Sequence, residues 1–169
     1  CFFVENQMHG ENIHDDLGPS TSARIVAAHV EEGIKLAERH RLPRQIRDLI
    51  AQHHGNKLVL YFYHRACLEG ETDPEGYRYP GPRPNTKEAA ILMLADTIEA
   101  AARSLKEHSN EAMESLVEKA ISENVVDGQL DECDLTLREL DLIKDSFKSV
   151  IRGVYHPRIE YPSPSPSVR

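Results

Sequence analysis

The sequence predicts an all-α protein, folded as a bundle of helices. Apolar residues recur at the 3.6-residue period of a helix through most of its segments, and residues typical of helix ends bound several of these segments. The 169 residues, of which 40% are hydrophobic and 28% charged, have the size and composition of one globular domain.

The first helix is expected to begin at Ser20 or Ser22, which both suit an N-cap, and to end near His40. His29 falls on its apolar stripe and is therefore expected to point inward. Gly33 lies on the same face and indicates a close contact with another helix. The stripe itself comprises Ile25, Val26, Val30, Ile34 and Ala37.

Residues 1–21 contain several turn-forming residues and are expected to be irregular. Within them, His14-Asp15-Asp16 has the composition of a metal-binding phrase. Its setting between Asn12 and Gly18-Pro19 is typical of a loop, so we interpret it as a solvated turn.

A second, short helix is expected from Leu42 to Gln52, with Pro43 in its first turn and Gly55 just past its end. His53 and His54 lie between this helix and the glycine, at a position where the chain leaves the helix.

Both of these histidines are expected on the buried side of the helix. Leu49 lies one turn below His53, Ile50 lies one turn below His54, and Ile46 is a further turn down. A buried imidazole needs a partner. Two interpretations remain open: hydrogen bonds to backbone carbonyls, or ligation of Zn, Mn or Fe.

The run from Lys57 to Leu68 has the β-branched and aromatic content of a strand, but its length and its helical neighbours favour a helix. Residues 69–85 follow as a long loop rich in Gly and Pro, as expected of a functional or an irregular segment. Tyr79 and Arg83 of this loop are candidates to stack on and clamp a ligand. The alternative is a plain surface loop.

A further helix is expected from Thr86 to about Lys106, with Ala90–Ala95 as its apolar centre. Asp96 follows directly, and a carboxylate there is costly unless it is paired or binds a metal. Arg103 lies two turns on, so a structural salt bridge from Arg103 to Asp96 or Glu99 is the alternative.

The last two helices are expected over residues 110–124 and 136–155. Thr136 and Glu139 form a capping box at the start of the final helix. The acidic residues that precede it do not have the spacing of an EF-hand. The side chains expected inside the final helix are Leu140, Ile143, Phe147, Val150, Ile151 and Val154.

The charge and composition exclude several classes of partner. A formal net charge of −8 argues against binding to a DNA or RNA duplex or to a membrane surface. The three cysteines are far apart, which fits a reducing compartment. The chain has no run of about 18 apolar residues, so nothing in it is expected to span a membrane.

Four candidate metal ligands therefore come from three helices: His29, His53, His54 and Asp96. Helical bundles build dinuclear sites in this way. Two divalent ions would stabilise the attacking and leaving oxygens of a displacement at phosphorus. Mixed His and Asp ligation suits Mn or Fe at least as well as Zn.

Several phrases, in order, carry a resemblance to a known family: Phe2-Phe3-Val4-Glu5-Asn6-Gln7, His53-His54-Gly55, Tyr79-Pro80-Gly81-Pro82, Ala95-Asp96-Thr97-Ile98-Glu99-Ala100-Ala101 and Asp127-Gly128-Gln129-Leu130-Asp131-Glu132-Cys133-Asp134-Leu135-Thr136. Over about residues 2–161 the chain resembles the HD-domain phosphohydrolases. It is most similar to the HD domain of bacterial seven-transmembrane proteins that act as cyclic di-AMP phosphodiesterases.

This resemblance implies an all-α HD-domain bundle over residues 1–161. Residues 162–169 begin with an alternating Pro/Ser run, and this composition predicts a disordered tail. The implied activity is metal-dependent hydrolysis of cyclic di-AMP to the linear dinucleotide, at the cytoplasmic face of the bacterial membrane in a multi-pass protein. A homodimer is one open possibility for the assembly.

The resemblance also implies site residues. His29, His53, His54 and Asp96 match the metal ligands, with Asp96 and His54 as the catalytic pair. The substrate-contact candidates are Tyr79, Arg83, Arg103 and His156.

One departure from the family is clear. The family's His-Asp doublet, in an HDxGK phrase, precedes the Phe-Phe-Val-Glu-Asn-Gln phrase, whereas this chain starts at Cys1. His14-Asp15 has neither the Gly-Lys nor the helix. The sequence is therefore expected to be a piece cut inside a longer protein. Two alternatives to a phosphodiesterase domain stay open. One is a catalytically incomplete module that binds a cyclic dinucleotide, and the other is a metal-free helical bundle.

Overall fold

The computed structural model describes residue 14, residues 16–105, residue 107 and residues 109–155. Over this part of the chain it consists of helices, and the all-α prediction is confirmed. The elements in order are α1 (Pro19–Arg39), α2 (Arg44–Gln52), α3 (Leu60–Leu68), the 3₁₀ helix η2 (Glu75–Tyr77), α4 (Lys87–Arg103), α5 (Asn110–Val126) and α6 (Leu137–Tyr155).

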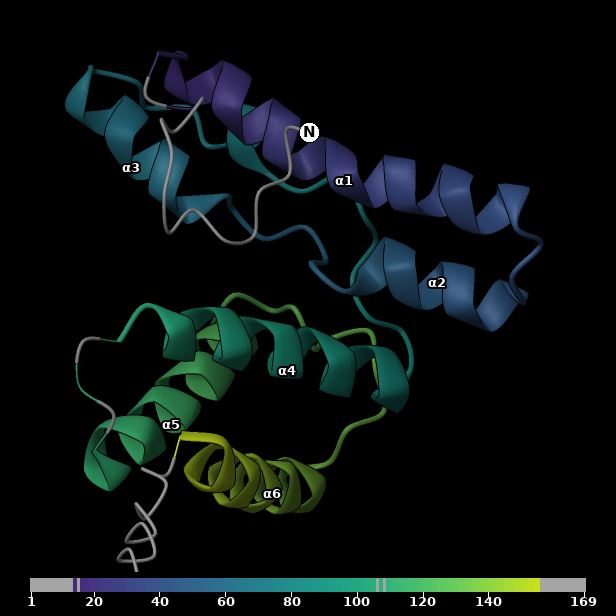
Figure 1. Cartoon of the computed structure of the whole chain (residues 1–169), viewed down its shortest axis with the longest axis vertical. Coiled ribbons are helices and arrows are strands. Elements are labelled where there is room, and N and C mark those ends of the chain that lie inside the picture. Colours follow the sequence, from purple (N-terminus) through teal and green to yellow (C-terminus); the bar gives the residue numbers. More distant parts are fainter. Residues whose placement is uncertain (1–13, 15, 106, 108, 156–169) are drawn as a thin grey trace, which may run out of the picture.

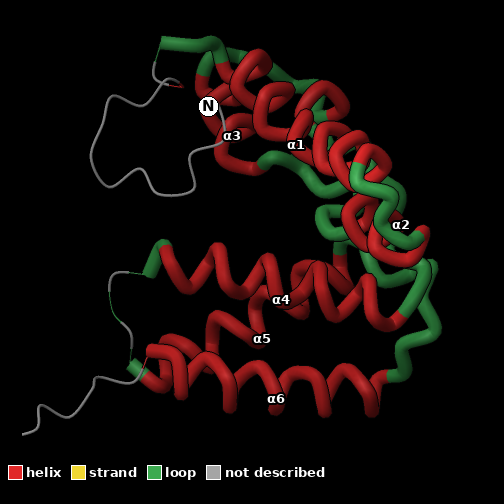
Figure 2. Tube along the Cα trace, turned by 45° about the vertical axis from the view of Figure 1, so that its right-hand side comes forward, coloured by secondary structure: helices red, strands yellow, loops and turns green. Residues whose placement is uncertain are grey.

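The helices form two groups that lie one above the other (Figure 1). In the first group α1 packs against α2, α3 and η2, and in the second α5 packs between α4 and α6. Contacts between α2 and α4 join the two groups, at one side of the molecule (Figure 2). Residues from both groups can therefore meet next to α2 and α4.

Each group has its own apolar core. The buried core of the α1–α3 group comprises Ala23, Val59, Phe62, Ala66 and Tyr77. The larger core of the α4–α6 group comprises Ala90, Leu94, Ile98, Ala102, Met113, Val117, Ala120, Ile121, Leu130 and Ile151. Burial of this apolar area holds each group together.

Two helix starts agree with the sequence, and one does not. Thr86 Oγ1 accepts a hydrogen bond from Ala89 N at 3.2 Å, and Thr136 with Glu139 forms the expected capping box. The prediction that Ser20 or Ser22 caps α1 was wrong, because neither side chain caps this helix. The helix starts earlier, at Pro19, whose fixed φ suits a first helical position.

The prediction of which apolar side chains are buried was wrong in places. Val150 and Val154 are 59% and 69% exposed on α6, and Ile46 is 42% exposed on α2. Periodicity assigns an apolar face, but only the neighbours decide how much of that face is covered. Gly33 does mark a close contact, because a Cβ there would lie 3.1 Å from Ile50 Cγ2 of α2.

The loop between α3 and α4 is held against the residues that precede α3. A helix was expected from Lys57, but α3 begins only at Leu60, and Leu58 instead forms an isolated antiparallel bridge with Arg78. Val59 N donates to Tyr77 O at 2.7 Å, and Tyr79 N donates to Lys57 O at 2.9 Å. This pairing places the Tyr79 side chain beside the turn that carries His53 and His54.

His14 lies near the N-terminal end of the described residues, where we expected a solvated turn. That prediction was wrong, because His14 is buried and its ring centroid lies 5.3 Å from that of Phe62. Asp15, His156 and the predicted tail over 162–169 lie outside the described residues. Among the described helices, none has both the length and the apolar character that a bilayer crossing requires.

Candidate metal centre

Three histidine rings converge where α1 meets the end of α2. His29 Nε2 lies 3.1 Å from His53 Nε2 and 3.1 Å from His54 Nε2. The ligand nitrogens of the three rings all lie within 4.8 Å of one another, which is close enough to hold a metal ion. The structure therefore brings together the three histidines that the sequence singled out.

In His29 and His53, the hydrogen bond made by Nδ1 determines that Nε2 is the acceptor nitrogen. His29 Nδ1 donates to Val26 O at 2.6 Å, and His53 Nδ1 donates to Ile50 O at 2.7 Å. Because a carbonyl only accepts, both Nδ1 atoms carry the proton, and a neutral ring then has its lone pair on Nε2. Two such nitrogens facing each other repel unless a cation lies between them, so these residues fit a metal ion.

His54, the third ring of the cluster, lies beside Asp96, the carboxylate that the sequence singled out. His54 Nδ1 lies 3.3 Å from Asp96 Oδ2. The pKa of His54 is lowered to about 3. Burial is the largest cause, and the neighbouring His53 and His29 rings lower it further. At neutral pH the pair is therefore an uncharged imidazole next to a carboxylate and not an ion pair. A carboxylate that accepts from a histidine Nδ1 orients the ring and makes its Nε2 a better ligand.

Two further pKa shifts agree with a cation site. Burial lowers the pKa of His53, which keeps this ring neutral as well. Burial raises the pKa of Asp96, and the nearby His53 and Lys57 oppose that shift. A bound divalent ion would offset the cost of burying this carboxylate. Asp96 adjoins the histidine cluster through His54 but is not one of its three mutually close members.

The turn after His54 is held by a buried amide that sequence reasoning missed. Gln129 is fully buried, and its Nε2 donates to Asn56 Oδ1 at 2.7 Å and to Asp127 Oδ2 at 2.8 Å. Asn56 N donates to Gln129 Oε1 at 3.3 Å. Gly55 has φ +56°, and a Cβ on it would collide with Gln129 Oε1. The Asp127-Gly128-Gln129 phrase was noticed in the sequence, but no local signal connects it to residues 55 and 56.

The loop before α4 packs against the same turn. Gln52 is buried, and its Oε1 accepts from Asn85 N at 2.9 Å. A Cβ on Gly81 would collide with Ala51 O, so only glycine permits this approach. The end of α2 is thus held from two directions, which fixes where His53 and His54 point.

Of the four substrate-contact candidates, Tyr79 lies at the cluster. Its ring stacks on His54 with centroids 4.2 Å apart and an interplanar angle of 23°. Burial, with a contribution from Asp96, raises the pKa of Tyr79 to about 12. The hydroxyl therefore stays protonated and is available as a hydrogen-bond donor at neutral pH.

Arg83 and Arg103 make other contacts. Arg83 Nε donates to Asn56 Oδ1 at 3.4 Å, and Arg83 Nη1 lies 3.7 Å from Asp131 Oδ2, so Arg83 supports the turn. Arg103 forms the salt bridge that was its alternative, with Glu99 Oε2 at 2.6 Å. His156 cannot be placed, since it lies outside the described residues.

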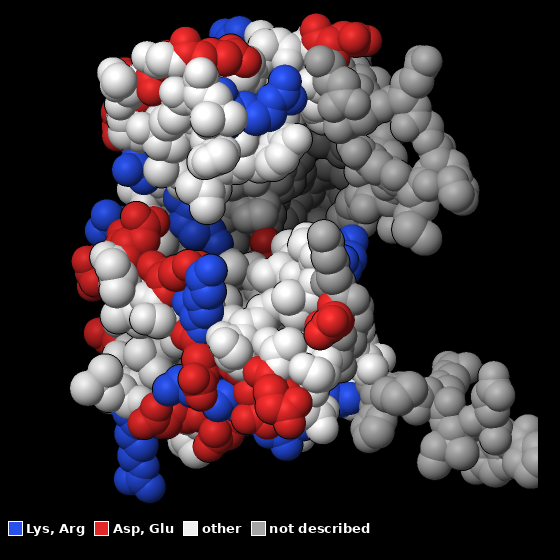
Figure 3. Space-filling model, turned by 90° about the vertical axis from the view of Figure 1, so that its left-hand side faces the viewer, with Lys and Arg blue, Asp and Glu red and all other residues white. Residues whose placement is uncertain are grey.

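A cleft of about 410 Å³ opens from the histidine cluster, between the two helical groups. The molecular surface is visibly hollowed between the groups, and acidic and basic side chains are intermixed over this face (Figure 3). The residues that line the cleft are His54, Lys57, Leu58, Leu60, Tyr79, Asp96, Thr97, Ala100, Glu123, Asn124 and Asp127. Lys57 and Thr97 were not identified as site residues from the sequence.

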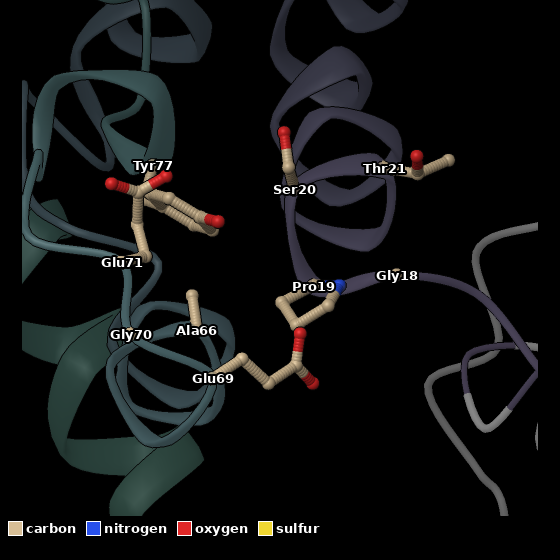
Figure 4. A pocket seen from close by; sticks show the side chains of 9 residues that line it. All are labelled: Gly18, Pro19, Ser20, Thr21, Ala66, Glu69, Gly70, Glu71 and Tyr77. Atoms are coloured by element: carbon tan, nitrogen blue, oxygen red, sulfur yellow. The ribbon is translucent and has the colours of Figure 1, made fainter.

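A second pocket lies away from the histidines, at the start of α1 (Figure 4). It has a volume of about 400 Å³ and brings together the first turn of α1 with Glu69, Glu71 and Tyr77. Its charged side chains are carboxylates, so it is a poor site for an anionic ligand.

The chain is similar in sequence to a known family and to known proteins. The family profile described as HD domain matches residues 6–101. The chain is 41% identical over 169 residues to the cyclic-di-AMP phosphodiesterase PgpH of Bacillus subtilis, with 99% of this chain and 24% of that protein covered. It is 40% identical over 165 residues to the protein of the same name from Listeria monocytogenes, with 95% and 23% covered. The chain thus spans about a quarter of the length of these relatives.

Solved structures show the same similarity. The crystal structure of the L. monocytogenes PgpH HD domain matches with a TM-score of 0.85 and 39% identity, over 92% of this chain and 73% of that one. The same domain in complex with cyclic di-AMP matches with a TM-score of 0.86 and 37% identity, over 91% and 72%.

Proposed function

The chain belongs to the HD domain family, and from that premise we propose that it is a metal-dependent phosphodiesterase domain that hydrolyses cyclic di-AMP to the linear dinucleotide. The observation that carries the proposal is the convergence of His29, His53 and His54, with two rings locked so that their acceptor nitrogens face each other. Two relatives named for this activity and a solved complex with cyclic di-AMP support the choice of substrate.

His29, His53, His54 and Asp96 would hold the metal, in a site of two divalent ions. Mixed imidazole and carboxylate ligation favours Mn or Fe, with Zn as the alternative. When bound, such ions offset the charge that develops on the phosphoryl oxygens and make a water molecule more acidic.

The chain's own residues orient this chemistry. Asp96 Oδ2 lies 3.3 Å from His54 Nδ1, where a carboxylate orients the ring, so these two residues are the proposed catalytic pair. Tyr79 covers one face of His54, where it excludes water and presents a protonated hydroxyl to the substrate. The further proposed substrate contacts are Arg83, Arg103 and His156. Of these, Arg83 also supports the turn and Arg103 pairs with Glu99.

The setting of the domain is part of the proposal. We place it at the cytoplasmic face of the bacterial membrane, within a longer multi-pass protein. The support is the resemblance in sequence and the length of the relatives, of which this chain covers about a quarter.

The test uses this domain extended at its N-terminus in the native gene product, with Mn²⁺ added. We expect chromatography to show conversion of cyclic di-AMP to the linear dinucleotide. Asp96→Ala should abolish turnover, because it removes the partner of His54, whereas the exposed Asp145→Ala on α6 should not. Equal turnover in Asp96→Ala would remove Asp96 from the mechanism. Tight binding without turnover in the unsubstituted protein would instead favour a catalytically incomplete binding module.

A further inference from the structure

Lys57 is a half-buried lysine on the wall of the cleft, three residues after His54. Its Nζ donates to Thr97 Oγ1 at 2.6 Å. Thr97 Oγ1 in turn donates to Met93 O at 2.8 Å, so its hydroxyl proton is engaged and its lone pairs face the ammonium. The ammonium is therefore held at one defined place, on the turn of α4 that also carries Asp96.

The backbone around Lys57 is equally well held. Lys57 N donates to His54 O at 3.4 Å, and Lys57 O accepts from Tyr79 N at 2.9 Å. The residue is thus positioned by the histidine turn and by the loop that carries Tyr79. Its side chain shares the cleft with His54, Tyr79 and Asp96.

The charges around Lys57 explain what it would do there. Burial lowers the pKa of Lys57, and the carboxylates of Asp96 and Asp127 oppose this shift by stabilising the charged form. If divalent ions occupy the proposed metal site, the charge of Asp96 is engaged with them. The ammonium then stands close to other cations and keeps Asp127 as its carboxylate neighbour, so a further anion between the ammonium and the metal ions would lower their mutual repulsion. A substrate phosphate would supply that anion.

We propose that the Lys57 ammonium, anchored by Thr97, binds a phosphate of the dinucleotide in this cleft. The inference rests on the proposed function, since it assigns a contact within the same site. Lys57 would act by binding and orientation, leaving the metal site itself unchanged. Among the described residues that line the cleft, it is the one Lys or Arg.

The experiment measures binding separately from turnover. The N-terminally extended protein is loaded with Mn²⁺, and the affinity for the linear dinucleotide, the product, is measured by calorimetry. Lys57→Met should raise the Kd by about tenfold to a hundredfold, as expected for loss of a charge-assisted hydrogen bond. Lys57→Arg should recover part of the affinity. The exposed Lys35→Met on α1 is the matched control and should bind like the unsubstituted protein.

Two further measurements separate phosphate binding from a structural role. The Kd of the unsubstituted protein should rise more steeply with salt than that of Lys57→Met, because one ionic contact is missing in the variant. The content of bound Mn should be the same in both. Thr97→Val keeps the cation and removes its anchor, so it should weaken binding less than Lys57→Met and provides a second variant if Lys57→Met does not fold.

The outcomes distinguish this inference from the function on which it rests. If the unsubstituted protein neither binds the linear dinucleotide nor hydrolyses cyclic di-AMP, the proposed function fails. If it does both, and Lys57→Met and Thr97→Val bind the product within twofold of it, the phosphate contact alone is overturned. Loss of Mn from Lys57→Met with no change in salt dependence would also overturn it.

Discussion

At the scale of single residues, each histidine of the cluster uses its two ring nitrogens for different purposes. The sequence offered two interpretations of His53: a hydrogen bond to a backbone carbonyl, or a metal ligand. The structure shows the first for Nδ1, which donates to Ile50 O, and this bond is what leaves Nε2 as an acceptor facing His29. The two interpretations are therefore compatible, because the carbonyl bond prepares the ring for a cation.

We expect His53→Ala to lower the content of bound metal well below that of the unsubstituted protein, because it removes one of three converging nitrogens. Elemental analysis after purification without chelators measures this. His64→Ala, at an exposed position on α3, is the matched control and should retain the metal. Equal metal content in the two variants would mean that His53 is not a ligand.

At the scale of elements, the start of α6 is tied to the start of α4. Glu139 completes the capping box with Thr136 and also accepts from Lys87 Nζ, at the first position of α4. Lys87 and then the Thr136 contacts lower the pKa of Glu139 to about 2, from an ordinary value of 4.5. The capping box was readable from the sequence because it is local, whereas the bridge to Lys87 spans 52 residues.

This shift predicts a dependence of stability on pH. A carboxyl whose pKa is depressed by folding contributes stability that is present above its ordinary pKa and is lost as pH falls toward its folded value. The Glu139 contribution should therefore disappear between about pH 4.5 and about pH 2. In chemical unfolding at a series of pH values, Glu139→Gln should show a smaller loss over this window than the unsubstituted protein.

Glu32→Gln, at an exposed position on α1, is the control and should follow the unsubstituted protein across the same pH series. Parallel curves for Glu139→Gln and the unsubstituted protein would show that the bridge to Lys87 does not stabilise the folded state.

At the scale of the whole molecule, two helical groups with separate cores meet beside the histidine turn. Gln129 belongs to the connection between α5 and α6, and Asn56 belongs to the turn after α2, so their hydrogen bonds cross from one group to the other. The buried amide therefore supports both the docking of the groups and the direction of His53 and His54.

Gln129→Leu should lower the free energy of unfolding by about 1–3 kcal/mol, because Asn56 N and Asp127 Oδ2 lose a partner. It should also lower the affinity for Mn²⁺, because the turn would no longer be held. Urea unfolding and metal titration measure the two effects. Gln45→Leu, exposed on α2, should change neither quantity, and an unchanged metal affinity in Gln129→Leu would exclude a positioning role.

Taken by itself, the sequence determined the helical class, most helix bounds and the four ligand candidates, because periodicity, caps and motif order are local properties. His29 was identified because it shares a stripe with Val30 and Ile34, and Asp96 because it interrupts an apolar run. Only the tertiary structure decided that Lys57 and Gln129 belong to the site, that Arg103 pairs with Glu99, and that Val150 and Val154 remain exposed. Those outcomes depend on which elements pack together across long separations in sequence, and no local pattern encodes that packing.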